Sequence, residues 1–125
     1  MGHVTVRISD SARGTLSELA RNEGKSMVAL LDEQAGRRPA LVLSEDVFNR
    51  GLGGLVVVLP MTSKPRGIPS HVPIEPPEGG VDRRTAVLCE AVRSISVERL
   101  IERWGTVGHP TMTAVEDRLR ILLRL

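Results

Sequence analysis

A basic loop is the first part of this sequence whose residue types could do chemistry. Arg37 and Arg38 follow Gly36 and precede Pro39, and an apolar run over residues 40–44 begins directly afterwards. The pattern predicts a loop that delivers two guanidinium groups to the end of a short strand. A guanidinium group matches phosphate oxygens with paired donors, so this loop is a candidate phosphodiester site. The alternative is an ordinary charged turn before a strand.

A second polar stretch follows the most apolar run of the chain. Residues 55–59 are all aliphatic and predict a buried central strand that stops at Pro60. The segment behind it, residues 61–67, is short, hydroxyl-bearing and basic, and its flanking prolines oppose a helix. An exposed turn at the end of a strand is the alternative for this segment. Its polar residues include Thr62, Ser63 and Lys64.

Composition limits the class of protein. At 125 residues the chain makes one domain, or a small domain with an appendage, and 41% hydrophobic residues suffice for one core. One Trp, one Phe and no Tyr leave that core aliphatic and argue against the base-stacking platforms of single-strand binders. A net charge of +2 permits a nucleic-acid partner without requiring one.

The number of cysteines and the length of the apolar runs indicate the cellular compartment of the protein. Cys89 is the sole cysteine, which excludes an internal disulfide and suits a reducing cytoplasm. No run approaches the roughly 20 apolar residues of a membrane span, and the start of the sequence has no secretory pattern. We therefore expect a soluble, cytoplasmic protein with no membrane partner. The three histidines and Cys89 lack the spacing of metal ligands, so we expect no metal and no cofactor.

The first third of the chain predicts a strand followed by two helices. Residues 4–8 alternate apolar and polar side chains, the period of a half-buried strand, and residues 9–11 can cap a helix. A glycine turn at 22–25 precedes Ser26, which can cap a second helix. That second helix would carry Met27, Leu30 and Leu31.

From residue 40 onward the sequence predicts short strands and one terminal helix. Further strands are expected at 71–74, 85–89 and 104–107, with a short helical turn at 96–101. Together these elements predict an α+β, mostly β fold, in which a small curved barrel precedes a C-terminal helix. The helix opens at Pro110, and its apolar face comprises Met112, Val115, Leu119, Leu122 and Leu123.

The first segment resembles the ribbon-helix-helix fold of antitoxins and small repressors. In that family, strands from two chains pair and enter the DNA major groove. The resemblance therefore implies a dimer, operator DNA as a partner, and Thr5 and Arg7 as base-facing positions. The alternative is an amphipathic extension that packs on the rest of the chain.

The remainder resembles the MazF/PemK family of toxin endoribonucleases, the mRNA interferases. We accordingly divide the chain into an antitoxin-type segment, residues 1–32, and a toxin-like domain, residues 33–125. The motifs that carry the resemblance, in the family's order, are Glu33-Gln34-Ala35-Gly36-Arg37-Arg38-Pro39-Ala40-Leu41-Val42-Leu43-Ser44, Leu59-Pro60-Met61-Thr62-Ser63 and Val87-Leu88-Cys89-Glu90-Ala91-Val92-Arg93-Ser94-Ile95.

This resemblance implies an SH3-like barrel that forms a homodimer and cuts single-stranded RNA without a metal ion. The ribose 2′-hydroxyl attacks the adjacent phosphorus and leaves a cyclic phosphate and a free 5′-hydroxyl. The family's two main catalytic positions fall on Arg38 and Thr62, and its loop glutamate falls on Glu33. Arg38 would stabilise charge on the phosphorane, Thr62 and Ser63 would contact the phosphate, and Glu33 would act as base or orient the substrate.

Other cations near these motifs are candidates for holding the RNA backbone, or are ordinary surface charge. His71 lies in a predicted strand, which favours a structural role for it over acid–base chemistry. The backbone candidates are Arg37, Lys64, Arg66 and Arg93.

The sequence departs from the family pattern at its start. The family's first strand is missing before Gln34, which would expose a sheet edge unless residues 4–8 or a swapped dimer fills the gap. Ala91 stands where relatives often carry glutamine. Three hypotheses follow: an active toxin held in check by a cognate antitoxin, an antitoxin–toxin fusion that binds DNA through an N-terminal ribbon beside an inactive barrel, or a remnant that only dimerises with intact partners.

Overall fold

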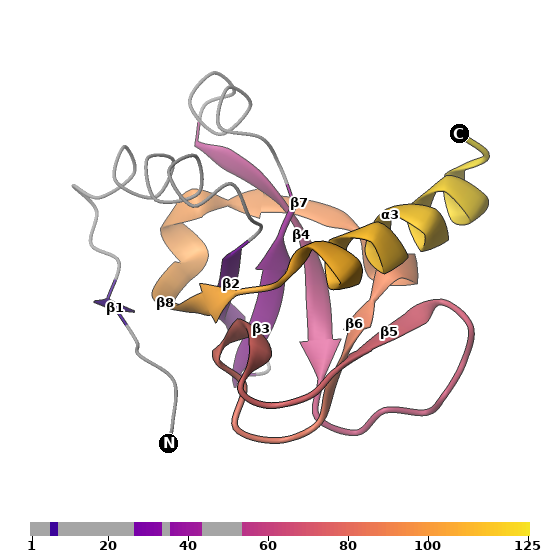
Figure 1. The fold of residues 1–125 in the computed structure, drawn as a ribbon. Coiled ribbons are helices and arrows are strands. Elements are labelled where there is room, and N and C mark those ends of the chain that lie inside the picture. Colours follow the sequence, from indigo (N-terminus) through magenta and orange to yellow (C-terminus); the bar gives the residue numbers. More distant parts are fainter. Residues whose placement is uncertain (1–5, 8–26, 34–35, 44–53) are drawn as a thin grey trace.

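The computed structural model describes residues 6–7, 27–33, 36–43 and 54–125, and these form a curved antiparallel sheet with one α-helix (Figure 1). Three short 3₁₀ turns, η2 (Glu78–Gly80), η3 (Cys89–Ala91) and η4 (Val97–Arg99), connect the strands. The helix is α3 (His109–Leu123). The strands are β1 (Val6–Arg7), β2 (Met27–Glu33), β3 (Gly36–Val42), β4 (Leu55–Thr62), β5 (His71–Ile74), β6 (Thr85–Leu88), β7 (Arg93–Ser96) and β8 (Leu100–Thr106).

The strands follow the order β1-β8-β2-β3-β4-β6-β5, and β7 pairs with β4. The strand β4 is central: it has neighbours on both edges, and its residues Val56, Val58, Leu59 and Met61 are buried. Along one edge it pairs with β3, and along the other it pairs first with β7 and then with β6. This arrangement confirms the predicted mostly β fold with a C-terminal helix.

The strand β4 continues through Pro60, where the sequence predicted its end. Leu43 donates its N–H to the carbonyl of Val57 at 2.8 Å, so in antiparallel alternation the odd-numbered residues of β4 bond toward β3. The nitrogen of Pro60 therefore points to the opposite edge. There, β7 pairs only as far as Val58 and β6 begins at Met61. The missing N–H of proline thus costs no ladder hydrogen bond.

The predicted second helix, beginning at Ser26, is wrong: Met27–Glu33 is the strand β2. This strand lies between β3 and β8, the place that a missing first strand would have left empty. Val28 packs in one core cluster and Met27 in a second one, so β2 is buried on both faces. A strand buried on both faces has no polar alternation, which is why helical spacing fitted this short apolar run equally well.

The strand β1 extends the end of the same sheet. Val6 pairs with Arg103 and Arg7 with Glu102, both in β8 of the same chain. The described residues of the predicted ribbon thus lie at the outer edge of β8 and do not fill the gap expected from a missing first strand, since β2 takes that place. Thr5 and the predicted helix after residue 8 lie outside the described residues, and the division predicted between residues 32 and 33 falls inside β2.

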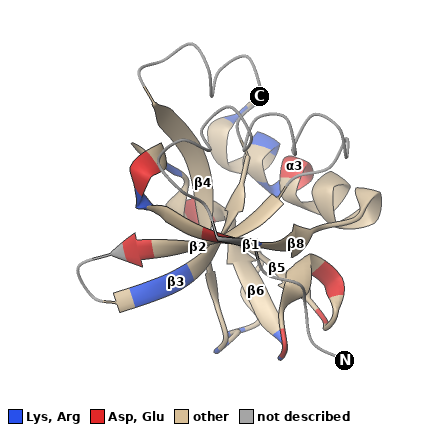
Figure 2. Ribbon diagram, turned by 90° about the vertical axis from the view of Figure 1, so that its left-hand side faces the viewer, with Lys and Arg blue, Asp and Glu red and all other residues tan. Residues whose placement is uncertain are grey.

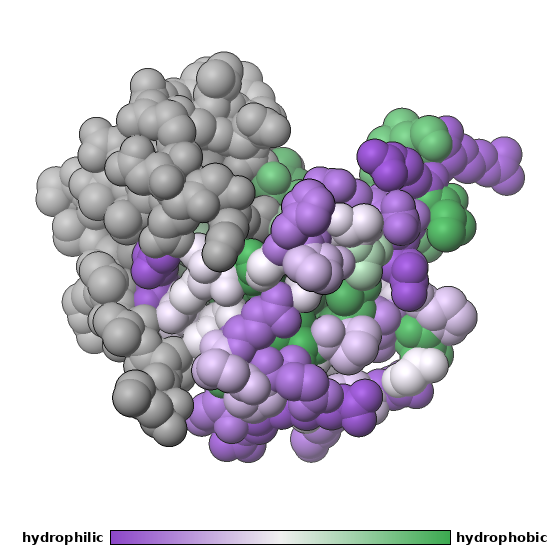
Figure 3. Space-filling model, in the orientation of Figure 1, coloured by the Kyte–Doolittle hydropathy of each residue, from purple (hydrophilic) through white to green (hydrophobic). Residues whose placement is uncertain are grey.

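The helix α3 covers one side of the sheet through Val115 and Leu119, which join the core cluster around β4 and β6 (Figure 1). The predicted apolar face is longer than the buried one. Leu122 and Leu123 are 44% and 52% exposed, because the last turn of α3 runs past the sheet (Figure 1). Figure 3 shows hydrophobic surface near this end of the chain. Among the described residues, no helix has the length and apolar character needed to cross a membrane.

Candidate active site

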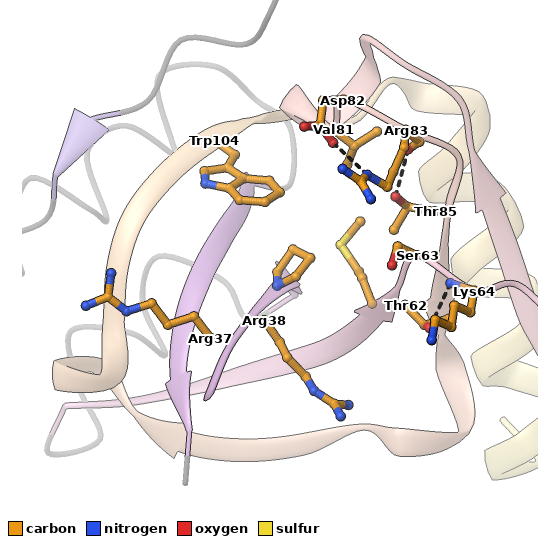
Figure 4. A pocket seen from close by; sticks show the side chains of 12 residues that line it. Arg37, Arg38, Thr62, Ser63, Lys64, Val81, Asp82, Arg83, Thr85 and Trp104 are labelled. Atoms are coloured by element: carbon orange, nitrogen blue, oxygen red, sulfur yellow. Dashed lines mark hydrogen bonds and ion pairs between the residues drawn. The ribbon is translucent and has the colours of Figure 1, made fainter. Parts of the chain in front are cut away.

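A groove of about 500 Å³ opens where the start of β3 meets the end of β4 (Figure 4). Its opposite wall comes from the segment between η2 and β6, and β8 contributes one residue. The residues that line it are Arg37, Arg38, Pro39, Met61, Thr62, Ser63, Lys64, Val81, Asp82, Arg83, Thr85 and Trp104.

Arg38 and Thr62 reach this groove from neighbouring antiparallel strands. The β3–β4 register pairs Ala40 with Pro60. Arg38 lies two residues before Ala40 and Thr62 two residues after Pro60, so both side chains lie on the same side of the strand pair. Arg38 and Thr62 are 24 residues apart in the sequence, and the sequence predicted that they act together. The register of β3 and β4 accounts for their proximity.

Arg37 occupies the next position of β3, and strand alternation sends its side chain away from that of Arg38. Figure 4 shows the two guanidinium groups extending in different directions, with that of Arg38 on the side of Thr62 and Lys64. Arg37 pairs in register with Asp32 of β2. Figure 2 shows this basic start of β3 beside the acidic end of β2. Arg38 is thus the better placed of the two arginines for contact with a ligand at Thr62.

The hydroxyl of Thr62 is oriented by the backbone. The N–H of Lys64 donates to Thr62 Oγ1 at 3.1 Å. A hydroxyl oxygen that accepts a hydrogen bond still has its own proton to donate, so this contact leaves the O–H available for a ligand oxygen. The same turn holds Ser63 and Lys64 at the rim, where both are exposed.

Positive charge dominates the groove. Four cations line it, Arg37, Arg38, Lys64 and Arg83, against the single carboxylate of Asp82. Arg83 Nε lies 3.3 Å from Asp82 Oδ1, but these side chains are 70% and 63% exposed, so solvent weakens that pair. The groove therefore favours an anionic ligand that can contact several cations at once.

The loop between β2 and β3 begins at Glu33 and ends at Gly36, which pair with each other in register. Gly36 has φ +122°, a backbone conformation that side-chain-bearing residues rarely adopt. Glycine at this position therefore permits the turn that leads into Arg38. Glu33 ends β2 at this hairpin, and its side chain is not among those described.

Two predicted cations lie apart from the groove. Arg66 is exposed in the connection between β4 and β5, and Arg93 lies in β7 opposite Val58 of β4. The structure thus brings Arg37, Arg38, Thr62, Ser63 and Lys64 to one groove and leaves Arg66 and Arg93 outside its lining.

Sequence reasoning missed the wall that faces β3 and β4. Thr85 is buried and donates its hydroxyl to the carbonyl of Arg83 at 2.9 Å, which holds the loop before β6. The run Asp82-Arg83-Arg84 between two glycines and a strand is a signal of a charged loop, but nothing in it points to Arg38. Trp104 was assigned only to a strand, although a lone tryptophan at a strand position is a candidate for a groove wall.

A second polar cluster lies outside the groove lining. His71 is buried in β5, and its Nε2 lies 3.1 Å from Glu90 Oε2, while the Ser70 hydroxyl donates to Glu90 Oε1 at 2.9 Å. Burial raises the pKa of Glu90, but its backbone N–H, Ser70 and His71 outweigh burial and hold that pKa below its usual range. These contacts connect the start of β5 to η3 and support the structural role predicted for His71.

Cys89 lies beside this cluster and is fully buried. Burial, and then the charge of Glu90, raise the pKa of the thiol to about 11 against a smaller opposing effect of Arg118. The thiol is therefore protonated at neutral pH, which makes it a poor nucleophile. In the described part of the chain, no three His, Cys, Asp or Glu side chains gather where they could hold a metal ion.

Comparison with known proteins places this chain in a family. A model of the PemK-like, MazF-like toxins of type II toxin–antitoxin systems matches residues 26–123. Over 88 residues the chain is 36% identical to the probable endoribonuclease MazF5 of Mycobacterium tuberculosis, covering 70% of this chain and 80% of that protein. Over 94 residues it is 31% identical to endoribonuclease EndoA of Bacillus subtilis, covering 74% of this chain and 81% of that protein.

The fold agrees with these sequence matches. A chain in the crystal structure of MazE-MazF (Form-II) from Deinococcus radiodurans superposes with a TM-score of 0.67 at 33% identity, covering 78% of this chain and 90% of that chain. The matched residues include β2, so the toxin-like part begins before the predicted loop at Glu33. The sequence and the fold together show that this chain belongs to the PemK-like, MazF-like toxin family of type II toxin–antitoxin systems.

Proposed function

We propose that this protein is the toxin of a type II toxin–antitoxin system and an endoribonuclease that cuts single-stranded RNA at short sequences. Two relatives are named endoribonucleases, and the match to each covers at least four-fifths of its length. The observation that carries the proposal is the juxtaposition of Arg38 and Thr62 in one cationic groove. A permanent cation and a hydroxyl donor in one groove suit a phosphodiester that gains charge as it reacts.

In the proposed reaction, the ribose 2′-hydroxyl attacks the adjacent phosphorus. The 2′-oxygen loses its proton to a base as the bond to phosphorus forms, and the bond from phosphorus to the 5′-oxygen then breaks. The 5′-oxygen takes up a proton, so the products are a 2′,3′-cyclic phosphate and a free 5′-hydroxyl. The reaction involves no oxidation or reduction and needs no co-reactant. We propose that it proceeds without a metal ion.

Arg38 would supply the electrostatic part of this catalysis. Its guanidinium cannot lose its proton at working pH, so it would donate to the non-bridging oxygens as their negative charge increases. Thr62 would donate its O–H to the same phosphate, because its oxygen is already occupied as an acceptor from Lys64. Glu33 ends β2 just before the turn to Gly36, where β3 begins, and is the candidate for the base or for orienting the substrate.

The remaining groove residues would hold the RNA backbone. Ser63 and Lys64 stand at the rim beside Thr62, and Arg37 extends the cationic surface along β3. Arg66 and Arg93 would contact the backbone beyond the groove. These cations predict that RNA binding weakens as the salt concentration rises.

We further propose a homodimer in the cytoplasm and a cognate antitoxin as partner. The support for the antitoxin is the family itself, which belongs to toxin–antitoxin systems, and the similar Deinococcus radiodurans structure, which is of MazE together with MazF. The antitoxin would block access of RNA to the toxin, so its removal would release the activity.

A cleavage assay with matched variants tests the proposal. Purified protein, Arg38→Ala and Arg120→Ala are each incubated with a long single-stranded RNA in EDTA, and new 5′-hydroxyl ends are labelled by polynucleotide kinase. Arg120 is the control because it lies on α3, exposed and 3.3 Å from Asp117, away from the groove lining. We expect the parent and Arg120→Ala to cut, and Arg38→Ala to lose about 100-fold or more in rate. Absence of cleavage by the parent, or equal cleavage by Arg38→Ala, would overturn it.

A further inference from the structure

Trp104 is the one aromatic side chain among the described residues that line the groove. It comes from β8, whereas Arg38 and Thr62 come from β3 and β4. Figure 4 shows its indole at the wall of the groove, on the side of Val81. The sparse aromatic residues argue against a surface that stacks several bases, but one tryptophan suffices for one base. We propose that Trp104 stacks on a single base of the RNA substrate, which positions the strand for cleavage at Arg38. This inference rests on the proposed function and adds a residue that determines substrate position.

A β-bulge aims Trp104 toward the groove. In the pairing of β2 with β8, Val28 lies opposite Gly105 and Ala29 lies opposite Arg103. Two consecutive residues of β2 therefore match two residues of β8 that are not consecutive, and Trp104 is the extra residue between them. A bulge interrupts the regular alternation of side chains along a strand, so it can turn the side chain of the extra residue in a new direction. Bulges that redirect a side chain in this way are common beside active sites.

One hydrogen bond restrains the indole, and close backbone packing restrains the residue that follows Trp104. Its Nε1–H donates to Glu102 Oε1 at 3.2 Å, which restrains the rotation of the ring. The next residue, Gly105, lies so close to η2 that a Cβ there would stand 2.9 Å from the backbone carbon of Gly79 and the nitrogen of Gly80. Backbone therefore packs directly against backbone beside Trp104. A ring held in this way loses little further freedom when a base stacks on it.

The surroundings of Trp104 suit a nucleotide strand better than a purely ionic ligand. Pro39, Met61 and Val81 supply apolar surface in the same groove, and Met61 and Val81 are buried. The cations lie at the ends of β3 and β4 and in the loop before β6. An apolar and aromatic wall beside several cations matches a ligand with a planar, weakly polar face and charged linkages on either side.

Intrinsic fluorescence gives a direct test, because Trp104 is the only tryptophan and the chain has no tyrosine. The parent protein is titrated with short random-sequence oligonucleotides that carry 2′-O-methyl groups, which block the attacking hydroxyl. A second titration uses an oligonucleotide of the same length and backbone without bases. Stacking is tolerant of sequence, so we expect the first probe to quench the fluorescence and the second, abasic probe to leave it unchanged.

Kinetics of two variants separate stacking from folding. We expect Trp104→Ala to raise KM for RNA cleavage by about 5-fold or more with little change in kcat, and Trp104→Phe to restore most of the loss. Thermal unfolding of each variant controls for stability. If RNA is cut but the probes do not quench and KM of Trp104→Ala is unchanged, the stacking role is overturned and the proposed function stands. If the base-bearing probe quenches the fluorescence and no RNA is cut, the base contact is supported and the proposed cleavage is overturned. If the probe does not quench and no RNA is cut, both the stacking role and the proposed function are overturned.

Discussion

Glu78 caps the helix α3 from another part of the chain: its Oε2 accepts the hydroxyl proton of Thr111 at 2.6 Å. The same oxygen accepts the N–H of Gly108, the residue that precedes the helix, at 2.9 Å. Gly108 has no side chain that could accept from the first-turn N–H groups of α3. Glu78 instead accepts the N–H of this N-cap residue, as the glutamate of a capping box does, and places its charge near the positive end of the helix dipole. This contact ties α3 to the segment that continues into the groove wall at Val81 and Asp82.

Removal of this cap should lower stability more than removal of an exposed ion pair. We expect Glu78→Ala to reduce the free energy of unfolding by about 1–2 kcal/mol, the cost of a lost helix cap with a charged acceptor. Glu75→Ala is the matched control, because Glu75 pairs with Arg84 at 3.0 Å where both side chains are 64% exposed. That change should cost no more than about 1 kcal/mol. Denaturant unfolding measures both, and equal effects would contradict a capping role for Glu78.

The hydroxyl of Thr62 should matter for cleavage and little for stability. Thr62→Val keeps the shape of the side chain but removes the donor proposed for the phosphate, so we expect kcat to fall by about 100-fold. The Lys64 N–H loses its acceptor but remains exposed to water, so the melting temperature should change little. Thr62→Ser restores the hydroxyl and should restore most of kcat. A Thr62→Val protein that cuts RNA at the parental rate would rule out this role.

Gly36 should be needed for the placement of Arg38. An alanine at φ +122° is strained, at a cost of about 1–3 kcal/mol, although nothing lies within 4 Å of the position its Cβ would take. We expect Gly36→Ala to shift the start of β3, and so to lower both stability and RNA cleavage. Gly67→Ala is the control, because φ is also positive there, at +69°, but neither neighbour of Gly67 lines the groove, whereas Arg37 follows Gly36 directly and does line it. It should lower stability alone, as measured by thermal unfolding beside the cleavage assay.

Cys89 should make stability fall at alkaline pH. The pKa of the thiol is 9.0 in the unfolded chain and about 11 in the folded protein. The folded state therefore binds more protons between these values, so this contribution is complete below pH 9 and is lost as pH rises through 11. The parent should thus lose more free energy of unfolding between about pH 8 and 10 than Cys89→Ala, although the variant starts less stable. Parallel curves for the two proteins would refute a buried neutral thiol.

The sequence predicted several elements because their signals are local. The five aliphatic residues from Leu55 to Leu59 predicted the centre of β4, and the spacing of Val115 and Leu119 predicted the buried face of α3. The apolar spacing of α3 continues to Leu123, but the sequence does not record where the sheet beneath the helix ends. Leu122 and Leu123 are exposed because they lie beyond the end of that sheet.

The error at β2 has a different origin. Seven residues cannot distinguish a helix from a strand by apolar spacing when consecutive apolar side chains are buried on opposite faces. Burial of Met27 and Val28 in different clusters depends on β3 and β8, which lie up to about 80 residues away in the sequence.

By itself, the sequence determined the family and the mostly β class, and it singled out Arg38 and Thr62 as candidates, because residue types in a fixed order carry that information. Only the tertiary structure decided that β2 is a strand, that Trp104 and Arg83 share the groove with Arg38, and that Glu78 caps α3. These contacts join segments far apart in the chain, and each depends on strand register, on a single bulge residue or on backbone packing at Gly105. Local spacing does not encode such distances, so Arg38 and Thr62 could be proposed from the sequence while the walls of the groove around them could not.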